Sequence, residues 1–330
     1  MLRRQAVTLA GALAGLAPLL PFGAARAQGA DWPSQPVRLV VPFAAGGPTD
    51  IPARLLAEEM ARFLPHRLVV ENRTGSGIIV GTDMVAKAPK DGLTLLYTTV
   101  GHAVVRALFD RVPFDPVADF APIALIGQVP MILMVNRDFP ARTLPELIAL
   151  LRDNPGRYDY ASSGNGGAVH LASELFLSMA GGLRANHVAF RGSSAAMPDV
   201  LAGRVPMILD VAGGALPYLQ RGELRALAIS TRARSPLAPE VPTFIEGGVA
   251  NYEAYTWHMA LAPAGTPPAA IRAANSAFNR ALANTALRTR LTEQAMEVVP
   301  DSTPDSAAAF LAAEIAKWEP IIRARGIKAG

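Results

Sequence analysis

A cluster of small polar residues lies directly before an apolar helical pattern, and its residue types suit the binding of an anion. The cluster consists of Ser162, Ser163, Gly164, Asn165, Gly166 and Gly167. The first amides of a helix have no acceptor inside the helix, and the helix dipole favours negative charge there. Glycines allow a ligand to come close to such amides. The cluster therefore predicts either a carboxylate-binding loop or an ordinary turn in which a serine or asparagine caps the helix.

Other kinds of chemistry find little support in the sequence. The chain has no cysteine, which excludes disulfides, thiolate catalysis and cysteine-ligated metals. Its five histidines form no HxxxH or HxH pair, and it contains neither a G-x-S-x-G motif nor a phosphate loop. We therefore predict no enzyme activity, no metal and no cofactor. An exported α/β hydrolase remains the enzymatic alternative.

The N-terminus has the order of residues that is typical of an export signal. Arg3 and Arg4 are followed by an apolar run from Ala6 to about Ala25, and Ala25-Arg26-Ala27 offers a cleavage site. We predict a signal peptide over residues 1–27, cleavage after Ala27 and a periplasmic, soluble mature protein. The arginine pair leaves both the Sec and the twin-arginine route open.

The charge of the mature chain argues against a nucleic-acid partner. The full chain has 31 basic and 27 acidic residues, and the predicted signal removes three arginines and no acid. The mature chain then carries 28 basic and 27 acidic residues, which are scattered rather than gathered in a stripe.

Short β-branched runs alternate with helical patterns, which indicates an α/β protein with a parallel sheet and helices on its faces. Two sets of such units are joined by extended segments, so we predict two lobes that close like a clamshell. The first lobe is predicted to comprise residues 31–128 plus 258–330, and the second residues 129–257. Thr143 is predicted to cap the first helix of the second set.

Ligands of open α/β sheets bind beyond the carboxyl ends of the strands. Most of the loops expected there are rich in Gly, Ser or Thr. They span Phe43–Asp50, Arg73–Ile79, Thr98–His102, Ser162–Gly167, Arg191–Ser194 and Asp210–Gly214. Their convergence predicts a polar cleft between the lobes.

Four segments together resemble a known family. They are VRLVVPFAAGGPTDIPARLLAEEM, VVENRTGSGIIVGTDMVAKAPKDGLTLL, YASSGNGGAVHLASELF and VPTFIEGGVANYEAYTWHMALAPAGTP. They are similar, in order along the chain, to the Bug receptors, which are the extracytoplasmic solute receptors of tripartite tricarboxylate transporters. The resemblance implies a two-lobed periplasmic binding protein fold, a small carboxylate-bearing ligand between the lobes, and membrane permease subunits as partners. We expect the receptor to be a monomer.

The resemblance also implies which residues bind the ligand. The first-lobe loop is matched by Phe43, Ala44, Gly46, Gly47 and Thr49, and the carboxylate is received by Ser162, Ser163, Gly164, Asn165 and Gly166. His170, Arg191 and Asp210 match further family positions. The chain departs from the family at Thr98-Thr99-Val100, at Val211 and at Ile78-Ile79, so the ligand is either less polar than citrate or these positions face the core.

Several of these residues have simpler interpretations that the sequence leaves open. Asp50 is expected mainly to stabilise its own helix, and His170 to pack in the first turns of the next one. Arg191 either pairs with a ligand carboxylate or faces solvent. Asp210 either binds a donor group of the ligand or caps the following helix near Gly213. The aromatic residues Phe43, Tyr255 and Trp257 either line the cleft or belong to the core.

A second function of the same class remains open as well. A closed receptor that contacts a membrane signalling protein would need the same cleft chemistry as one that serves a transporter. Ligand sensing is therefore the alternative to transport.

Overall fold

The computed structural model describes residues 32–329. The predicted signal peptide and its cleavage site at Ala27 lie outside the described residues. Among the residues described, no helix has both the length and the apolar character needed to cross a bilayer.

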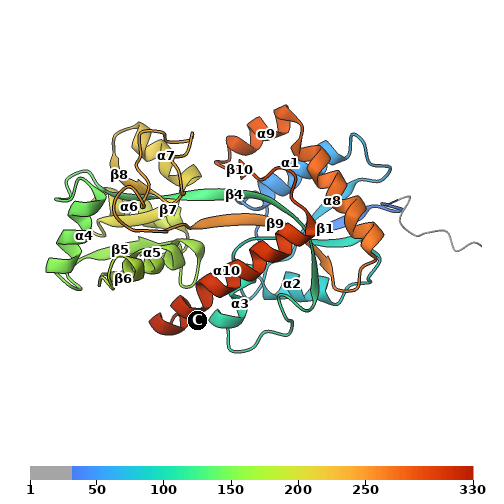
Figure 1. Ribbon diagram of the computed structural model, residues 1–330, viewed down its shortest axis with the longest axis horizontal. Coiled ribbons are helices and arrows are strands. Elements are labelled where there is room, and N and C mark those ends of the chain that lie inside the picture. The colour runs from blue at the N-terminus through green and yellow to red at the C-terminus, as the bar shows by residue number, and fades with distance from the viewer. Residues whose placement is uncertain (1–31, 330) are drawn as a thin grey trace, which may run out of the picture.

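Strands and helices alternate along most of the chain (Figure 1). The strands are β1 (Val37–Val41), β2 (Leu68–Asn72), β3 (Thr94–Thr98), β4 (Phe120–Asn136), β5 (Asp159–Ser162), β6 (Asn186–Ala189), β7 (Met207–Val211), β8 (Leu224–Ile229), β9 (Tyr255–Pro263) and β10 (Glu297–Val298). The helices are α1 (Asp50–Met60), α2 (Ile79–Ala86), α3 (Gly101–Leu108), α4 (Leu144–Asp153), α5 (Ala168–Met179), α6 (Ser193–Leu201), α7 (Ala212–Gln220), α8 (Pro268–Leu282), α9 (Thr285–Thr292) and α10 (Pro304–Arg325).

The sheet is mixed rather than parallel throughout. Its main strand order is β2-β1-β3-β9-β4-β7-β5-β6, and β8 and β10 also pair with β4. The βα units place β1, β2 and β3 parallel to one another, and likewise β5, β6 and β7. β4 and β9 run antiparallel to their neighbours because they connect the two sets of βα units instead of belonging to one. The predicted parallel arrangement is present within each set of βα units, and the two connecting strands run antiparallel to them.

β4 is the longest strand, and it extends through both sets of units (Figure 1). Its residues Phe120–Pro130 pair with β9, and Met131–Asn136 pair with β7 and β8. The lobe boundaries predicted after residues 128 and 257 therefore fall inside β4 and β9.

Local signals explain several helix ends. Thr143 Oγ1 accepts the Glu146 amide, which confirms the predicted cap of α4. α10 begins with a capping box between Thr303 and Ser306, and it ends at Gly326 in the left-handed conformation. Buried apolar side chains alternate to the two faces of the sheet and form two clusters, each containing residues from both sets of units.

The last helix, α10, joins the two halves of the molecule (Figure 1). It packs against α3 and β4 on one side and against α5 on the other. Glu314 at its middle accepts the indole N–H groups of Trp257 and Trp318, each at 2.9 Å. At its end, Arg325 forms an ion pair with Glu174 of α5 at 3.0 Å. The helix is thus tied to both sets of βα units.

Candidate functional site

The segment Ser162–Gly167, called here the carboxylate loop, connects β5 to α5 as the sequence predicts. α5 begins at Ala168, and its N-cap is Gly167, which is extended and offers no side-chain cap. The alternative of a serine or asparagine cap is therefore wrong. Within residues 32–329 the amides of Ala168 and Val169 have no hydrogen-bond acceptor. The His170 amide also has no acceptor among these residues, so three donors at the positive end of the helix are unpaired.

The two central glycines of the loop have backbone conformations that side chains rarely adopt. Gly164 has φ +138° and Gly166 has φ +70°. A Cβ atom on Gly166 would lie 2.8 Å from both δ carbons of Leu108, at the end of α3. Gly166 is therefore required both for its conformation and for the close approach of α3.

The amides of these glycines are bound inside the protein. The Gly164 amide donates to Ser162 Oγ at 3.1 Å, and the Gly166 amide donates to His170 Nδ1 at 3.0 Å. A ligand carboxylate would consequently meet the first-turn amides of α5 rather than those of Gly164 and Gly166. The binding role predicted for Ser163 and Asn165 stays a prediction.

His187 is a part of this site that the sequence analysis missed. It lies on β6, where the parallel register pairs it with Tyr160 of β5. Its Nε2 is 2.6 Å from Ser162 Oγ, and its ring stacks on that of His170 with centroids 3.7 Å apart. Only the register of β6 brings it to the loop, so no local motif signals its role.

Burial governs the titration of these two histidines. Burial, and to a smaller extent the neighbouring His187, together lower the pKa of His170 to about 4. Burial also lowers the pKa of His187, against the opposing effect of Glu174. Both rings are therefore neutral at pH 7.

Asp210 lies at the end of β7 and is fully buried. Its Oδ1 accepts the Ser193 hydroxyl at 2.6 Å and the Val211 amide at 2.9 Å. Its Oδ2 has no hydrogen-bond partner within the described residues, and burial raises the pKa of the carboxyl. The predicted cap through amides near Gly213 is not formed, because the N-cap of α7 is Val211. A contact with a ligand donor remains a prediction.

Arg191 is exposed, and among residues 32–329 its side chain has no hydrogen-bonding or ionic partner. The loop that carries it is nevertheless fixed beside the carboxylate loop, because the Gly192 amide donates to Ser163 O at 3.1 Å. A role for Arg191 as the cation that pairs with a ligand carboxylate stays a prediction.

The first-half loop, Phe43–Thr49, is held by Asp50. Asp50 Oδ2 accepts the Gly46 amide and Arg54 Nε, each at 2.8 Å, and Oδ1 accepts Asn72 Nδ2 at 2.8 Å. Ala44 is exposed, Phe43 and Gly47 are half-buried, and Thr49 is buried before α1. Across the described chain, no hydrogen bond joins this loop to the carboxylate loop.

Asp50 is expected to be a structural residue, as the sequence analysis favours. Asp50→Ala should lower the free energy of unfolding by ~2–4 kcal/mol, because three donors lose one buried charged acceptor. Urea denaturation measures the change. Asp50→Asn keeps an acceptor and should cost less. An alanine variant as stable as the parent would contradict this role.

The pH dependence of this contribution has a definite sign. Burial raises the pKa of Asp50, but hydrogen bonds from Arg54, Gly46 and Asn72 outweigh it and leave the pKa lowered. The stabilisation is therefore present above the ordinary pKa of an aspartate and is lost as the pH falls through the lowered value.

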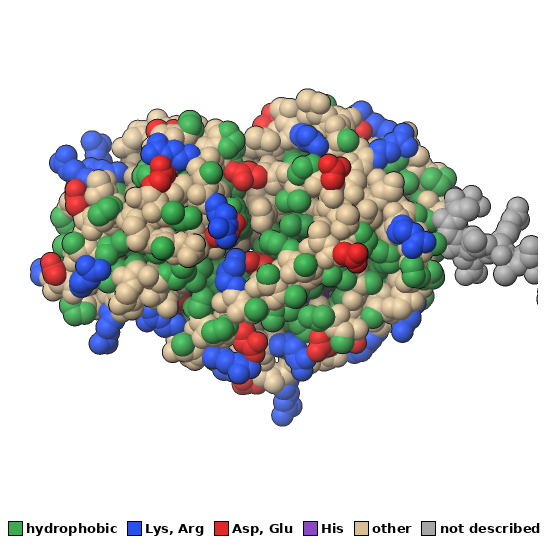
Figure 2. All heavy atoms as spheres, viewed as in Figure 1, with side chains coloured by type: hydrophobic (Ala, Val, Ile, Leu, Met, Phe, Trp, Pro, Cys, Tyr) green, Lys and Arg blue, Asp and Glu red, His purple; other side chains and the backbone are tan. Residues whose placement is uncertain are grey.

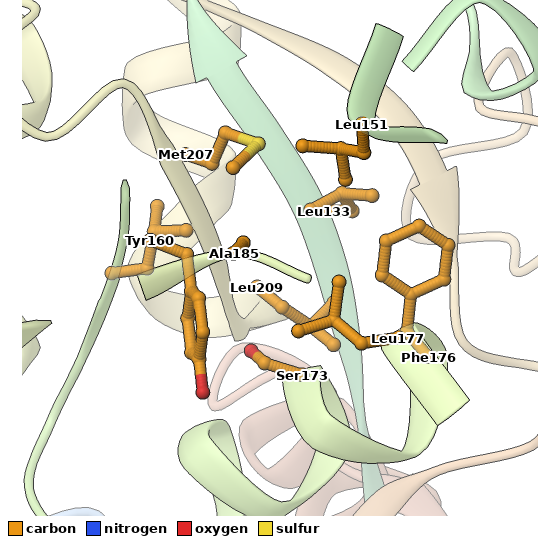
Figure 3. A pocket seen from close by; sticks show the side chains of 10 residues that line it. Leu133, Leu151, Tyr160, Ser173, Phe176, Leu177, Ala185, Met207 and Leu209 are labelled. Carbon is orange, nitrogen blue, oxygen red and sulfur yellow. The ribbon is translucent and has the colours of Figure 1, made fainter. Parts of the chain in front are cut away.

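The aromatic candidates belong to the core more than to a cleft. Trp257 is fully buried and bonded to Glu314, and Tyr255 is 8% exposed. A small apolar cavity of about 20 Å³ lies among residues of β4, β5, β7, α4 and α5, and Tyr160, Ser173, Phe176 and aliphatic side chains line it (Figure 3). It has room for about one water molecule and is too small for an organic acid.

Ser162 and His187 lie as close as a catalytic nucleophile and its base, but they lack the other parts of such a site. Ser162 is 0% exposed, and its oxygen accepts the Gly164 amide. Glu174 binds Tyr160 and Arg325 rather than orienting His187. The hydrolase alternative therefore has no accessible nucleophile at this serine.

Two further predictions can be compared with the described residues. In residues 32–329, no group of three or more His, Asp or Glu side chains is arranged to hold a metal ion. Figure 2 shows basic and acidic side chains interspersed over one face, without a basic stripe on that face.

Comparison with known proteins places these features in context. The sequence profile of the tripartite tricarboxylate transporter family receptors matches residues 52–327. Protein BugT of Bordetella pertussis is 35% identical over 299 residues, which cover 90% of this chain and 91% of BugT.

Solved structures give the same result for the fold. Rpa4515 of R. palustris, solved with adipate, has a TM-score of 0.77 and 34% identity, covering 90% of this chain and 99% of its own. MatC of Rhodopseudomonas palustris, solved with bound malate, has a TM-score of 0.74 and 33% identity, and the match covers 88% of this chain and 100% of MatC. The periplasmic binding protein BugD has a TM-score of 0.74 and 31% identity, and the match covers 90% of this chain and 99% of BugD. These relatives are solute-binding receptors rather than enzymes, with the two-lobed periplasmic binding protein fold.

Proposed function

Because this chain belongs to the tripartite tricarboxylate transporter receptor family, we propose that it captures a small dicarboxylate in the periplasm and delivers it to the permease subunits of such a transporter. The observation that carries the proposal is that, among residues 32–329, the first-turn amides of α5 have no acceptor and the adjoining loop carries an exposed arginine without a partner. Two similar receptors were solved with adipate and with malate, which supports the ligand class.

The proposed binding site combines the loops of both halves. One carboxylate is received by Ala168 and Val169 with the side chains of Ser163, Asn165 and Arg191. The rest of the molecule is enclosed by Phe43, Ala44, Gly46, Gly47 and Thr49, while Asp210 accepts a donor group on ligands that carry one. Ser162, Gly164, Gly166 and His170 shape the loop from within.

The remaining features of the receptor are proposals on the same basis. The lobes comprise residues 31–128 plus 258–330 and residues 129–257, and they close about β4, β9 and α10. Export removes residues 1–27, and the mature monomer begins at Gln28. Closure encloses the ligand and presents one surface to the permease.

Thermal denaturation with added dicarboxylates tests the function. Adipate or malate at one hundred times its Kd should stabilise the fold by about 2.7 kcal/mol and raise Tm by several degrees, because a ligand of the native state shifts the unfolding equilibrium. Adipamide is the matched control, since it has the length of adipate without its charges. Equal shifts with adipate and adipamide would contradict carboxylate recognition, and the absence of any shift across a series of organic acids would contradict the proposed ligand class.

A further inference from the structure

The carboxylate loop is held from behind by two stacked imidazoles. His170 comes from α5 and His187 from β6, and their rings are 3.7 Å apart and inclined by only 11°. His170 Nδ1 accepts the Gly166 amide at 3.0 Å, while His187 Nε2 is 2.6 Å from Ser162 Oγ, which in turn accepts the Gly164 amide. Each histidine thus fixes one of the two glycines with positive φ.

The groups around the pair come from three elements. Tyr160 of β5 stacks on His187 with centroids 5.1 Å apart, and its hydroxyl donates to Glu174 Oε1 of α5 at 2.5 Å. Arg325 of α10 pairs with the other oxygen of Glu174. An open groove is lined by both histidines together with Glu174, Arg325 and Lys328. Protons can therefore reach the pair, and Glu174 favours a positive charge on His187 while burial opposes it.

We propose that His170 and His187 are positioning residues that hold the carboxylate loop in its binding geometry while both are neutral, and that acid releases the loop. The ligand side of this inference depends on the proposed function, whereas the hold on the loop does not. Neither residue needs to touch the ligand.

The two protonation states differ in what they can do for the loop. A neutral His170 accepts the Gly166 amide only if its proton is on Nε2. A protonated His170 has a proton on Nδ1 as well, so it turns a donor toward the Gly166 N–H and the bond is lost. Two charged rings at this separation also repel each other, and a charged His187 can only donate to Ser162 Oγ.

Matched substitutions separate the hydrogen bonds from the stacking. Asparagine has an oxygen near the place of Nδ1, so His170→Asn preserves the acceptor, and His170→Phe preserves the ring without it. His187→Gln and His187→Phe form the corresponding pair at Nε2. Each variant is first shown to be folded by circular dichroism.

Two measurements need no ligand. In the ¹⁵N-labelled parent, NMR should find His170 as the Nε2–H tautomer at pH 7, protonated only near pH 4, where its pKa lies. The Gly166 amide should exchange with solvent about tenfold faster or more in His170→Phe than in the parent, and His170→Asn should restore most of the protection. His258, which is buried away from the loop, serves as the internal reference.

Calorimetry with adipate as the probe then tests the consequence. The phenylalanine variants should bind adipate about tenfold or more weakly at pH 7, and the asparagine and glutamine variants should come within about threefold of the parent. From pH 6 down to about pH 4, adipate affinity of the parent should fall more steeply than that of His170→Asn, because protonation of adipate itself is common to both.

The outcomes distinguish the two proposals. Unchanged Gly166 exchange in folded His170→Phe, or an Nδ1–H tautomer in the parent, overturns the positioning role whether or not adipate binds. If the exchange data agree but adipate does not bind the parent, the positioning role stands and the proposed ligand class fails. Parallel pH profiles for the parent and His170→Asn overturn the acid release.

Discussion

Gly166→Val is expected to abolish dicarboxylate binding, with a loss of about hundredfold or more in affinity. Gly166 has φ +70°, and a Cβ atom there would lie 2.8 Å from two atoms of Leu108. A β-branched residue at positive φ adds strain of ~1–3 kcal/mol, and relief of the clash requires a shift of the loop or of Leu108 on α3. The hundredfold loss corresponds to one or two charge-assisted hydrogen bonds of ~1.5–3 kcal/mol each. Titration calorimetry with adipate measures the effect.

A second glycine provides the control for strain alone. Gly182 has φ +72°, in the turn after α5, and an added Cβ would meet no atom within 4 Å. Gly182→Val should therefore lower the stability of the protein without changing its affinity for adipate. A folded Gly166→Val protein that binds adipate as tightly as the parent would show that the ligand is held elsewhere.

Glu314→Leu should produce the largest loss of stability, ~3–5 kcal/mol in the free energy of unfolding. Glu314 is 3% exposed, and one of its oxygens accepts both indole N–H groups at 2.9 Å. Its other oxygen pairs with Lys317. Leucine would leave two buried indole donors without an acceptor and a partly buried ammonium without its counter-ion. Urea denaturation followed by circular dichroism measures the loss.

Two variants on the same helix test this explanation. Glu314→Gln keeps a carbonyl oxygen for the indoles and should lose much less stability. Glu319, whose side chain is 42% exposed and paired with Arg323, should tolerate Glu319→Gln with a change below about 1 kcal/mol. Equal losses for leucine and glutamine at position 314 would mean that the charge, and not the acceptor, is what matters there.

The parts of the site that depend on local sequence were predictable. The carboxylate loop, the start of α5 and the cap at Thr143 follow from glycine and hydroxyl residues beside an apolar helical pattern. The structural role expected of Asp50 also follows from its place in a first helical turn, and the bonds it forms agree.

The parts that depend on strand register and on distant contacts were not predictable. His187 reaches Ser162 only because β6 pairs with β5 in one register. Leu108 belongs to another βα unit, and nothing in the sequence of either segment indicates that Leu108 lies next to Gly166. β4 and β9 are apolar like the parallel strands, so their sequences do not show their antiparallel direction. The sequence likewise does not reveal that the Gly164 and Gly166 amides donate to side chains of the protein itself.

Because Trp257 and Trp318 share the Glu314 carboxylate, the tryptophan fluorescence of the protein can report on this contact. The chain has three tryptophans, and these two have their indole N–H groups on one oxygen of Glu314, at the contact of β9 with α10. Indole emission responds to a nearby charge. Intrinsic fluorescence should therefore respond to a movement that separates Glu314 of α10 from Trp257 of β9, without a dye or an added label, and stopped-flow mixing can test whether the proposed lobe closure involves such a movement.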